Sequence, residues 1–260
     1  MLRISIHTHL RYAMREPVSL LLQIEAVPDA TQVIESSALT VATPVTWNVI
    51  PGDDRIGERR WGSVDDIFDC TYRALVFVDR PIVQLAALQA TPLLTLPGDV
   101  TPYVMPSRYC HPEAFFAFVP MQFGDLTGGA LIAQMAEWIE ANFTYDNNAS
   151  TAATSATDSF HAMAGVCRDY AHVLIAMARS VGIPARMASV YAPGVDPPDF
   201  HAVAEVYLEG SWHLVDPTGM AHPTEMVRIG VGRDAADVSF MTSYGQMDLL
   251  EQSVHVTAAT

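Results

Sequence analysis

The chain has 260 residues, of which 50% are hydrophobic and 17% are charged, a composition that can bury a sizeable core. Its 14 basic residues, all Arg, stand against 29 acidic residues and leave a net charge of −15. A surface with this charge repels phosphate backbones and anionic lipids, so we expect no nucleic-acid partner and no membrane partner. The sequence contains no apolar run of roughly 18 residues, the length that spans a bilayer, and no visible signal peptide. We therefore expect a soluble, cytoplasmic protein.

Alternating hydrophobicity in the first hundred residues predicts β-strands. In the first such segment, Ile4, Ile6 and Leu10 fall on one face, whereas the other face is mostly polar. Comparable segments lie at 19–26, 45–50 and 71–78. Short strands at this spacing, separated by turn-rich sequence, predict an antiparallel β-sandwich.

A Pro-rich segment, residues 91–112, is interpreted as the connection to a second region. That region begins with a predicted helix, in which Leu131, Met135 and Ile139 lie on one apolar stripe. We therefore predict an α+β protein with two domains. A β-rich N-terminal domain covers residues 1–104, and a mixed domain covers residues 105–260.

The segment 165–186, GVCRDYAHVLIAMARSVGIPAR, predicts a second helix whose first turn contains Cys167. The unpaired N–H groups and positive dipole end of a helix N-terminus stabilise a thiolate, which is the nucleophilic form of cysteine. Cys70 and Cys110 lie in a predicted strand and in the Pro-rich connection, so we interpret both as structural. Three scattered cysteines without CxxC spacing favour neither a disulfide framework nor a cysteine-based zinc site.

The segment 200–219, FHAVAEVYLEGSWHLVDPTG, predicts a β-hairpin that supplies a base and an acid. Glu209-Gly210 suits a two-residue turn. The register that this turn sets places His201 and Asp216 on one face as diagonal cross-strand neighbours. His213 falls on the opposite face, so it is not the expected partner of Asp216.

Cys167, His201 and Asp216 together form a predicted Cys–His–Asp triad. His201 would take the thiol proton and later protonate the leaving amine, while Asp216 would accept a hydrogen bond from the other ring nitrogen and so select the tautomer. The backbone N–H of Cys167 would donate one hydrogen bond to the oxyanion. The sequence does not place a second oxyanion donor.

Two charged residues near this triad are given structural roles. Asp169 lies near the helix start and is interpreted as a partner of the helix dipole, next to Arg168. Glu205 shares the strand face of His201, where a salt bridge is expected rather than catalysis.

The two segments quoted above and a third, RIGVGRDAADVSF (residues 228–240), resemble the core of the bacterial transglutaminase-like superfamily. The resemblance covers residues 105–260, and the first hundred residues are more loosely similar to the β-rich region that often precedes this core. It implies a papain-like α+β core, acyl transfer through a thioester, and no metal or cofactor. The family's nucleophile, base and orienting acid correspond to Cys167, His201 and Asp216. The loop 192–199, APGVDPPD, is expected to shape the acceptor side of the site.

The leading hypothesis is a cysteine acyl-transfer enzyme that attacks a glutamine side chain or a peptide amide. An amine acceptor would resolve the thioester in a transglutaminase, and water would resolve it in a protease. The partner is then a protein or peptide substrate, and the oligomeric state is not predicted.

Two alternatives belong to other classes of protein. One is a non-catalytic binding module that keeps the fold, although the presence of all three triad candidates favours an enzyme. The other is a metallohydrolase that uses His201, His213 and Asp216, and the opposite faces of the two histidines count against it.

Overall fold

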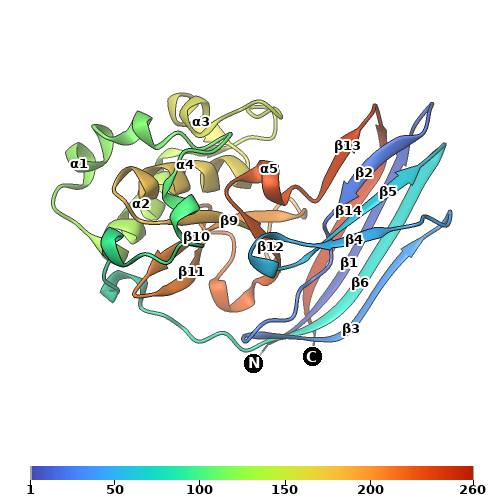
Figure 1. Ribbon diagram of the computed structural model, residues 1–260, viewed down its shortest axis with the longest axis horizontal. Helices are drawn as coiled ribbons and strands as arrows, with labels where there is room; N and C mark the ends of the chain where they lie inside the picture. Colours follow the sequence, from blue (N-terminus) through green and yellow to red (C-terminus); the bar gives the residue numbers. More distant parts are fainter. Residues whose placement is uncertain (1, 260) are drawn as a thin grey trace.

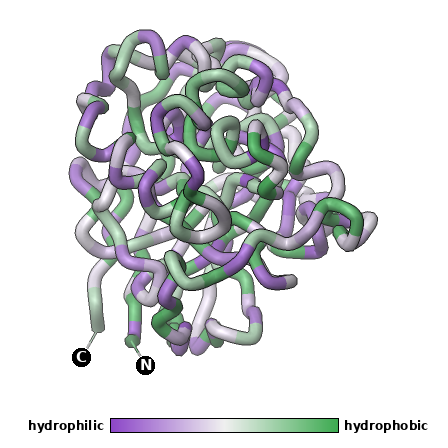
Figure 2. Tube along the Cα trace, turned by 90° about the vertical axis from the view of Figure 1, so that its left-hand side faces the viewer, coloured by the Kyte–Doolittle hydropathy of each residue, from purple (hydrophilic) through white to green (hydrophobic). Residues whose placement is uncertain are grey.

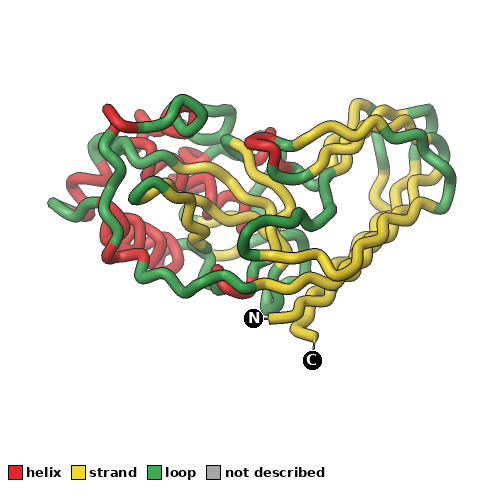
Figure 3. The backbone as a smooth tube through the Cα atoms, turned by 60° about the horizontal axis from the view of Figure 1, so that its bottom comes forward, coloured by secondary structure: helices red, strands yellow, loops and turns green. Residues whose placement is uncertain are grey.

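The computed structural model describes residues 2–259, with the long strands at one end of the molecule and the helices at the other (Figure 1, Figure 3). The strands are β1 (Leu2–Ala13), β2 (Val18–Leu22), β3 (Gln32–Val41), β4 (Asn48–Pro51), β5 (Glu58–Val64), β6 (Ile67–Val78), β7 (Thr144–Tyr145), β8 (Ala164–Gly165), β9 (Ala185–Tyr191), β10 (His201–Leu208), β11 (Ser211–Val215), β12 (Val227–Gly232), β13 (Met241–Tyr244) and β14 (Asp248–Ala259). The α-helices are α1 (Phe118–Phe123), α2 (Gly128–Asn142), α3 (Ala156–Ala162), α4 (Cys167–Ser180) and α5 (Ala235–Val238). The predicted α+β class is confirmed.

Two four-stranded antiparallel sheets form the strand-rich end, in the orders β14-β1-β6-β3 and β13-β2-β5-β4. Their inward-facing residues pack into one hydrophobic core, in which Ile4, Leu10 and Val76 are fully buried. Arg3 and other outward residues of β1 remain partly exposed. The period-2 alternation of a half-buried strand therefore predicted these faces correctly, and the β-sandwich is confirmed.

The predicted domain division needs a correction at its C-terminal end. β13 and β14 follow the mixed region in sequence, yet β13 pairs with β2 and β14 pairs with β1 along nearly its whole length. The two ends of the described chain consequently lie side by side (Figure 1, Figure 2). A strand pairs with whatever sheet edge offers free N–H and C=O groups, and sequence order does not identify that edge. Residues 241–259 therefore belong with the sandwich rather than with the core.

The Pro-rich segment 91–112 is more than a connection. It forms short 3₁₀ turns, and Tyr103, Tyr109 and Cys110 are buried. The thiol of Cys110 is fully buried and donates a hydrogen bond to the backbone oxygen of His172 in α4. Proline prevents long helices here, but the residues between the prolines supply apolar side chains that the core buries.

The mixed region is built on a third antiparallel sheet, in the order β11-β10-β9-β12, which packs against α4. α4 is buried around most of its circumference, so it is a central helix rather than a surface helix with one apolar face. Tyr191, at the end of β9, stacks on Tyr72 of the sandwich with ring centroids 6.2 Å apart, and its hydroxyl donates to the backbone oxygen of Ile24 at 2.6 Å. The sandwich and the mixed region thus share packed apolar surface.

Among residues 2–259, no single helix is long and apolar enough to cross a membrane. The segments Pro112–Phe123 and Gly128–Asn142 reach that length and composition only as a pair, with a bend of 97° between them.

A buried ion-pair network connects the third sheet to the sandwich. The carboxylate of Glu205 in β10 lies between Arg186 of β9, at 2.7 Å, and Arg228 of β12, and it is fully buried. Arg186 also contacts Asp54 at 3.0 Å, and Arg228 contacts Asp29. Burial raises the pKa of Glu205, but the positive charges of Arg228 and Arg186 outweigh it and lower the pKa below its usual range. The predicted structural role of Glu205 is confirmed.

Replacing Glu205 with Gln is expected to lower the free energy of unfolding by about 3 kcal/mol, because two buried guanidinium groups lose a shared counter-charge. Since the pKa of Glu205 is lower in the folded state, its contribution is present at neutral pH and is lost as the pH falls through that lowered value. Urea denaturation at pH 7 measures the change. The matched control is Glu16→Gln, which removes one negative charge from an exposed turn and should change stability by less than about 0.5 kcal/mol. Equal effects of the two substitutions would contradict this role.

Candidate active site

Cys167 is the first residue of α4, as the sequence predicted, and only 9% of it is exposed. The buried carboxylate of Asp169 accepts a hydrogen bond from the backbone N–H of Val166 at 2.9 Å, which holds the turn that enters the helix. Gly165 permits this arrangement, because a Cβ at that position would lie 2.6 Å from the Cβ of Asp169. The Gly-Val-Cys-Arg-Asp sequence therefore positions the thiol by fixing the backbone of the turn that precedes it.

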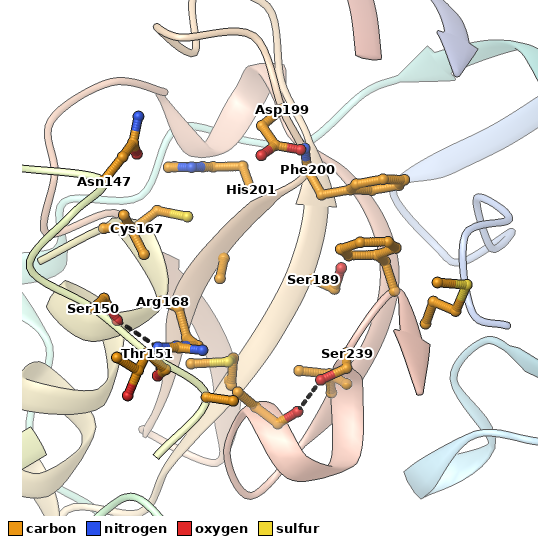
Figure 4. A pocket seen from close by; sticks show the side chains of 18 residues that line it. Asn147, Ser150, Thr151, Cys167, Arg168, Ser189, Asp199, Phe200, His201 and Ser239 are labelled. Carbon is orange, nitrogen blue, oxygen red and sulfur yellow. Dashed lines mark hydrogen bonds between the residues drawn. The ribbon is translucent and has the colours of Figure 1, made fainter. Parts of the chain in front are cut away.

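Arg168 connects the helix start to the loop before α3. Its guanidinium group donates to the hydroxyl of Ser150 at 2.5 Å (Figure 4). It also donates to the backbone oxygen of Thr151 at 2.7 Å and to the carboxylate of Asp169 at 3.2 Å. The side chain is part of the wall next to Cys167, and three partners hold it in place.

His201 and Asp216 come together as the predicted hairpin register requires. Leu208 pairs with Ser211 across the two-residue turn, in which Glu209 and Gly210 both have positive φ, 48° and 79°. This register brings Nε2 of His201 to 2.9 Å from Oδ2 of Asp216. The imidazole is almost completely buried, so little water competes for this hydrogen bond.

The carboxylate of Asp216 is saturated with donors. Oδ1 accepts from the backbone N–H of Thr218 at 2.9 Å and from its hydroxyl at 2.7 Å, and Oδ2 accepts from the backbone N–H of Ala221 at 2.9 Å as well as from His201. Burial raises the pKa of Asp216, but these hydrogen bonds and the charge of His201 outweigh it and lower the pKa. Thr218 was not among the predicted site residues, although Asp followed two residues later by Thr is the pattern of an Asx turn.

The second ring nitrogen of His201 faces the thiol. Nδ1 is buried and has no partner at hydrogen-bonding distance among the described residues, and Figure 4 shows the sulfur of Cys167 pointing toward the ring. Burial by itself lowers the pKa of His201, but its interactions with Asp216 and Cys167 outweigh burial and raise the pKa to about 10. The imidazole is therefore held in its protonated form at neutral pH, next to the sulfur.

A cavity of about 410 Å³ opens beside these groups. Cys167, Arg168 and His201 form part of its wall, and apolar residues form much of the rest. Phe200 stacks on Phe240, which lies in the segment leading back to the sandwich, with ring centroids 4.5 Å apart and planes within 5° of each other. The segment that leads from the mixed region back to the sandwich thus forms part of the cavity wall. This contribution was not predicted from the sequence.

Residues 124–217 match the model of a family described as the transglutaminase-like superfamily. This segment contains the thiol, the imidazole and the carboxylate described above. A candidate cysteine protease from Cytophaga hutchinsonii, known from a crystal structure, aligns with a TM-score of 0.93 and 29% identity over 100% of this chain and 91% of that one. Residues 124–217 therefore form a transglutaminase-like domain, and the chain as a whole resembles that candidate cysteine protease in its fold.

Two mycobacterial proteins are also similar to this transglutaminase-like chain. An uncharacterized protein of Mycobacterium leprae is 26% identical over 203 residues, which are 69% of this chain and 71% of that protein. An uncharacterized protein of Mycobacterium tuberculosis is 30% identical over 123 residues, which are 42% of this chain and 39% of its own length.

Tyr145, which was not among the predicted site residues, also lies next to the thiol in this transglutaminase-like core. β7 pairs with β8, and this pairing sets Tyr145 opposite Gly165, two residues before the thiol. Burial first, and then the charge of Cys167, raise the pKa of Tyr145, while a hydrogen bond from the backbone N–H of Cys167 acts in the opposite direction. The phenol therefore keeps its proton beside the sulfur and can donate a hydrogen bond there.

The other candidate groups lie away from the sulfur. Cys70 and Cys110 are fully buried, and burial raises the pKa of each thiol to about 12. His172 stacks on Tyr109 deep in the core, with ring centroids 5.0 Å apart. His213 contacts the backbone oxygen of Leu208 at 3.3 Å. Within residues 2–259, no three His, Cys, Asp or Glu side chains gather closely enough to hold a metal ion, so the alternative site that includes His213 is not assembled.

Proposed function

We propose that this protein is a cysteine acyl-transfer enzyme that attacks a carboxamide, either a glutamine side chain or a peptide bond, through a thioester on Cys167. The observation that carries the proposal is the environment of His201. Its buried imidazole lies between the carboxylate of Asp216 and the thiol of Cys167, with a pKa of about 10 and the unpartnered Nδ1 available to the sulfur. A thiolate paired with an imidazolium is the reactive state of a cysteine nucleophile.

In the first half-reaction, Sγ of Cys167 would attack the carbonyl carbon and form a tetrahedral intermediate. The phenol of Tyr145, which accepts a hydrogen bond from the backbone N–H of Cys167, borders the sulfur and would donate its own proton in a hydrogen bond to the oxyanion. The C–N bond then breaks, and the leaving nitrogen takes the proton from His201, which leaves a thioester and a neutral imidazole.

In the second half-reaction, His201 would accept a proton from an incoming amine or water as that nucleophile attacks the thioester carbonyl. The C–S bond breaks, and the thiolate–imidazolium pair is restored. Throughout the cycle, Asp216 would hold the ring by its Nε2 and remain ionised, since its four hydrogen bonds stabilise the carboxylate.

The test is alkylation of the three cysteines by substoichiometric iodoacetamide between pH 5 and pH 11, followed by peptide mapping. We expect Cys167 to react selectively at pH 6, because its sulfur lies at the start of α4 beside the positively charged ring of His201. Cys70 and Cys110 should remain unmodified, since burial raises their pKa to about 12.

The variant His201→Ala should lose the selectivity at pH 6. Labelling of Cys167 that is no faster than that of the other two thiols would contradict the proposal and favour a binding module with the same fold. The pH dependence of kcat/KM should agree with the labelling. Its alkaline limb should lie near pH 10 rather than near the ordinary histidine value, because above that pH the ring has no proton to give the leaving group.

A further inference from the structure

Asp199 lies in the wall of the catalytic cavity, two residues before His201, and has no role in the steps above. It ends the acidic loop 192–199. Figure 4 shows its carboxylate close to the imidazole, whereas Arg168 extends from the other side of the Cys167 side chain. The two ends of the cavity therefore differ in charge.

The carboxylate of Asp199 is held in place through one of its oxygens. Oδ1 accepts from the backbone N–H of Phe200 at 2.7 Å and from the side-chain amide of Gln252 at 2.8 Å. Gln252 lies on β14, so the sandwich fixes this group from outside the core. Within residues 2–259, no Arg or His forms an ion pair with Asp199, and Oδ2 has no hydrogen-bond partner.

The charge of Asp199 acts on the site itself. It contributes to the raised pKa of Tyr145, whose phenol lies beside Cys167. The side chain of Asp199 is exposed at the cavity mouth, but protein surrounds it closely. The resulting loss of solvation raises the pKa of Asp199, and this effect outweighs the two hydrogen bonds at Oδ1, which lower the pKa. A cation at this point would replace the lost solvation of a carboxylate that the fold leaves unpaired.

Because Asp199 lies on the His201 side of the cavity, it contacts the part of the substrate that binds on that side. A leaving amine takes its proton from His201, and an attacking amine gives its proton to the same ring, so both occupy the His201 side of the thioester. The acyl portion is then directed to the other side, toward Arg168 and the apolar wall.

We propose that Asp199 binds a positively charged group on the amine moiety of the substrate. In transamidation, this group is the second cation of a diamine or of a basic peptide acceptor. In hydrolysis, it is a basic side chain that immediately follows the scissile amide. The inference rests on the proposed function, and it makes Asp199 a specificity-determining residue rather than a catalytic one.

The experiment compares two acceptors of equal length, 1,5-diaminopentane and pentylamine, with a glutamine-containing peptide as the acyl donor. Because the chain has no Lys, cross-linking through its own lysines cannot compete. The wild-type protein should prefer the diamine by about fivefold in kcat/KM, the size expected of a partly exposed ion pair. In Asp199→Asn this preference should disappear through a rise in KM for the diamine. In the matched control Asp196→Asn, an exposed residue of the same loop outside the cavity wall, the preference should persist.

If water is the only acceptor, the same comparison uses peptides that carry lysine or acetylated lysine directly after the scissile amide. A thioester on Cys167, detected by intact mass, together with equal use of both amines or both peptides, would overturn the inference and leave the proposed function standing. The same holds if Asp199→Asn retains the preference. A wild-type protein that forms no thioester with any donor would overturn the proposed function, and this inference with it.

Discussion

Cys167→Ala is expected to abolish thioester formation and to lower kcat by a factor of about 10⁶, the size of effect expected when a triad nucleophile is removed. No other thiol can replace it, because Cys70 and Cys110 are fully buried in separate parts of the molecule. The fold should persist, because the helix terminus at Cys167 is held by the carboxylate of Asp169, which accepts a hydrogen bond from the backbone N–H of Val166. Intact mass spectrometry detects the thioester, and release of ammonia or of the leaving amine measures turnover.

The matched control for this substitution is Cys110→Ala, which removes the same atom from a fully buried site. It should lower the free energy of unfolding, because the core loses packed volume and the hydrogen bond to His172. Its turnover should stay within about twofold of wild type, the scatter expected of a remote core change. Residual turnover in Cys167→Ala at the level of the control would mean that another group carries the chemistry.

Asp216→Asn is expected to lower kcat by a factor of about 10³ to 10⁴, the cost of presenting the base in the wrong tautomer and orientation. The amide has one acceptor oxygen, whereas the carboxylate serves His201, Ala221 and both donors of Thr218. Because the negative charge is lost while burial remains, the pKa of His201 should fall from about 10. The alkaline limb of the kcat/KM profile should move to lower pH by the same amount.

The control for this second prediction is Asp29→Asn. This substitution changes an aspartate that makes the same hydrogen bonds to a threonine two residues later, but outside the active site. Asp29 accepts from the backbone N–H of Thr31 at 2.6 Å and from its hydroxyl at 2.8 Å, and it also pairs with Arg228. The variant should lose stability without moving the alkaline limb. An unchanged pH profile in Asp216→Asn, or a shifted one in Asp29→Asn, would show that Asp216 does not orient the base.

The sequence by itself was sufficient for the local parts of the site. The helix start at Cys167 follows from a helical pattern that begins there, and the contact between His201 and Asp216 follows from a two-residue turn, because turn length sets hairpin register. The β-sandwich follows from period-2 alternation. Each of these features depends on residues close in sequence, for which periodicity and turn chemistry are strong constraints.

Only the tertiary structure decided which distant segments meet. β14 completes the first sheet, Gln252 on that strand holds Asp199, Phe240 closes the cavity, and Tyr145 reaches the sulfur. None of these contacts has a local signal, since an open sheet edge or an apolar surface accepts many partners and the whole packed molecule selects among them. The pKa of His201 likewise depends on the tertiary structure, because burial and the contacts with Asp216 and Cys167, which the fold brings together, determine it.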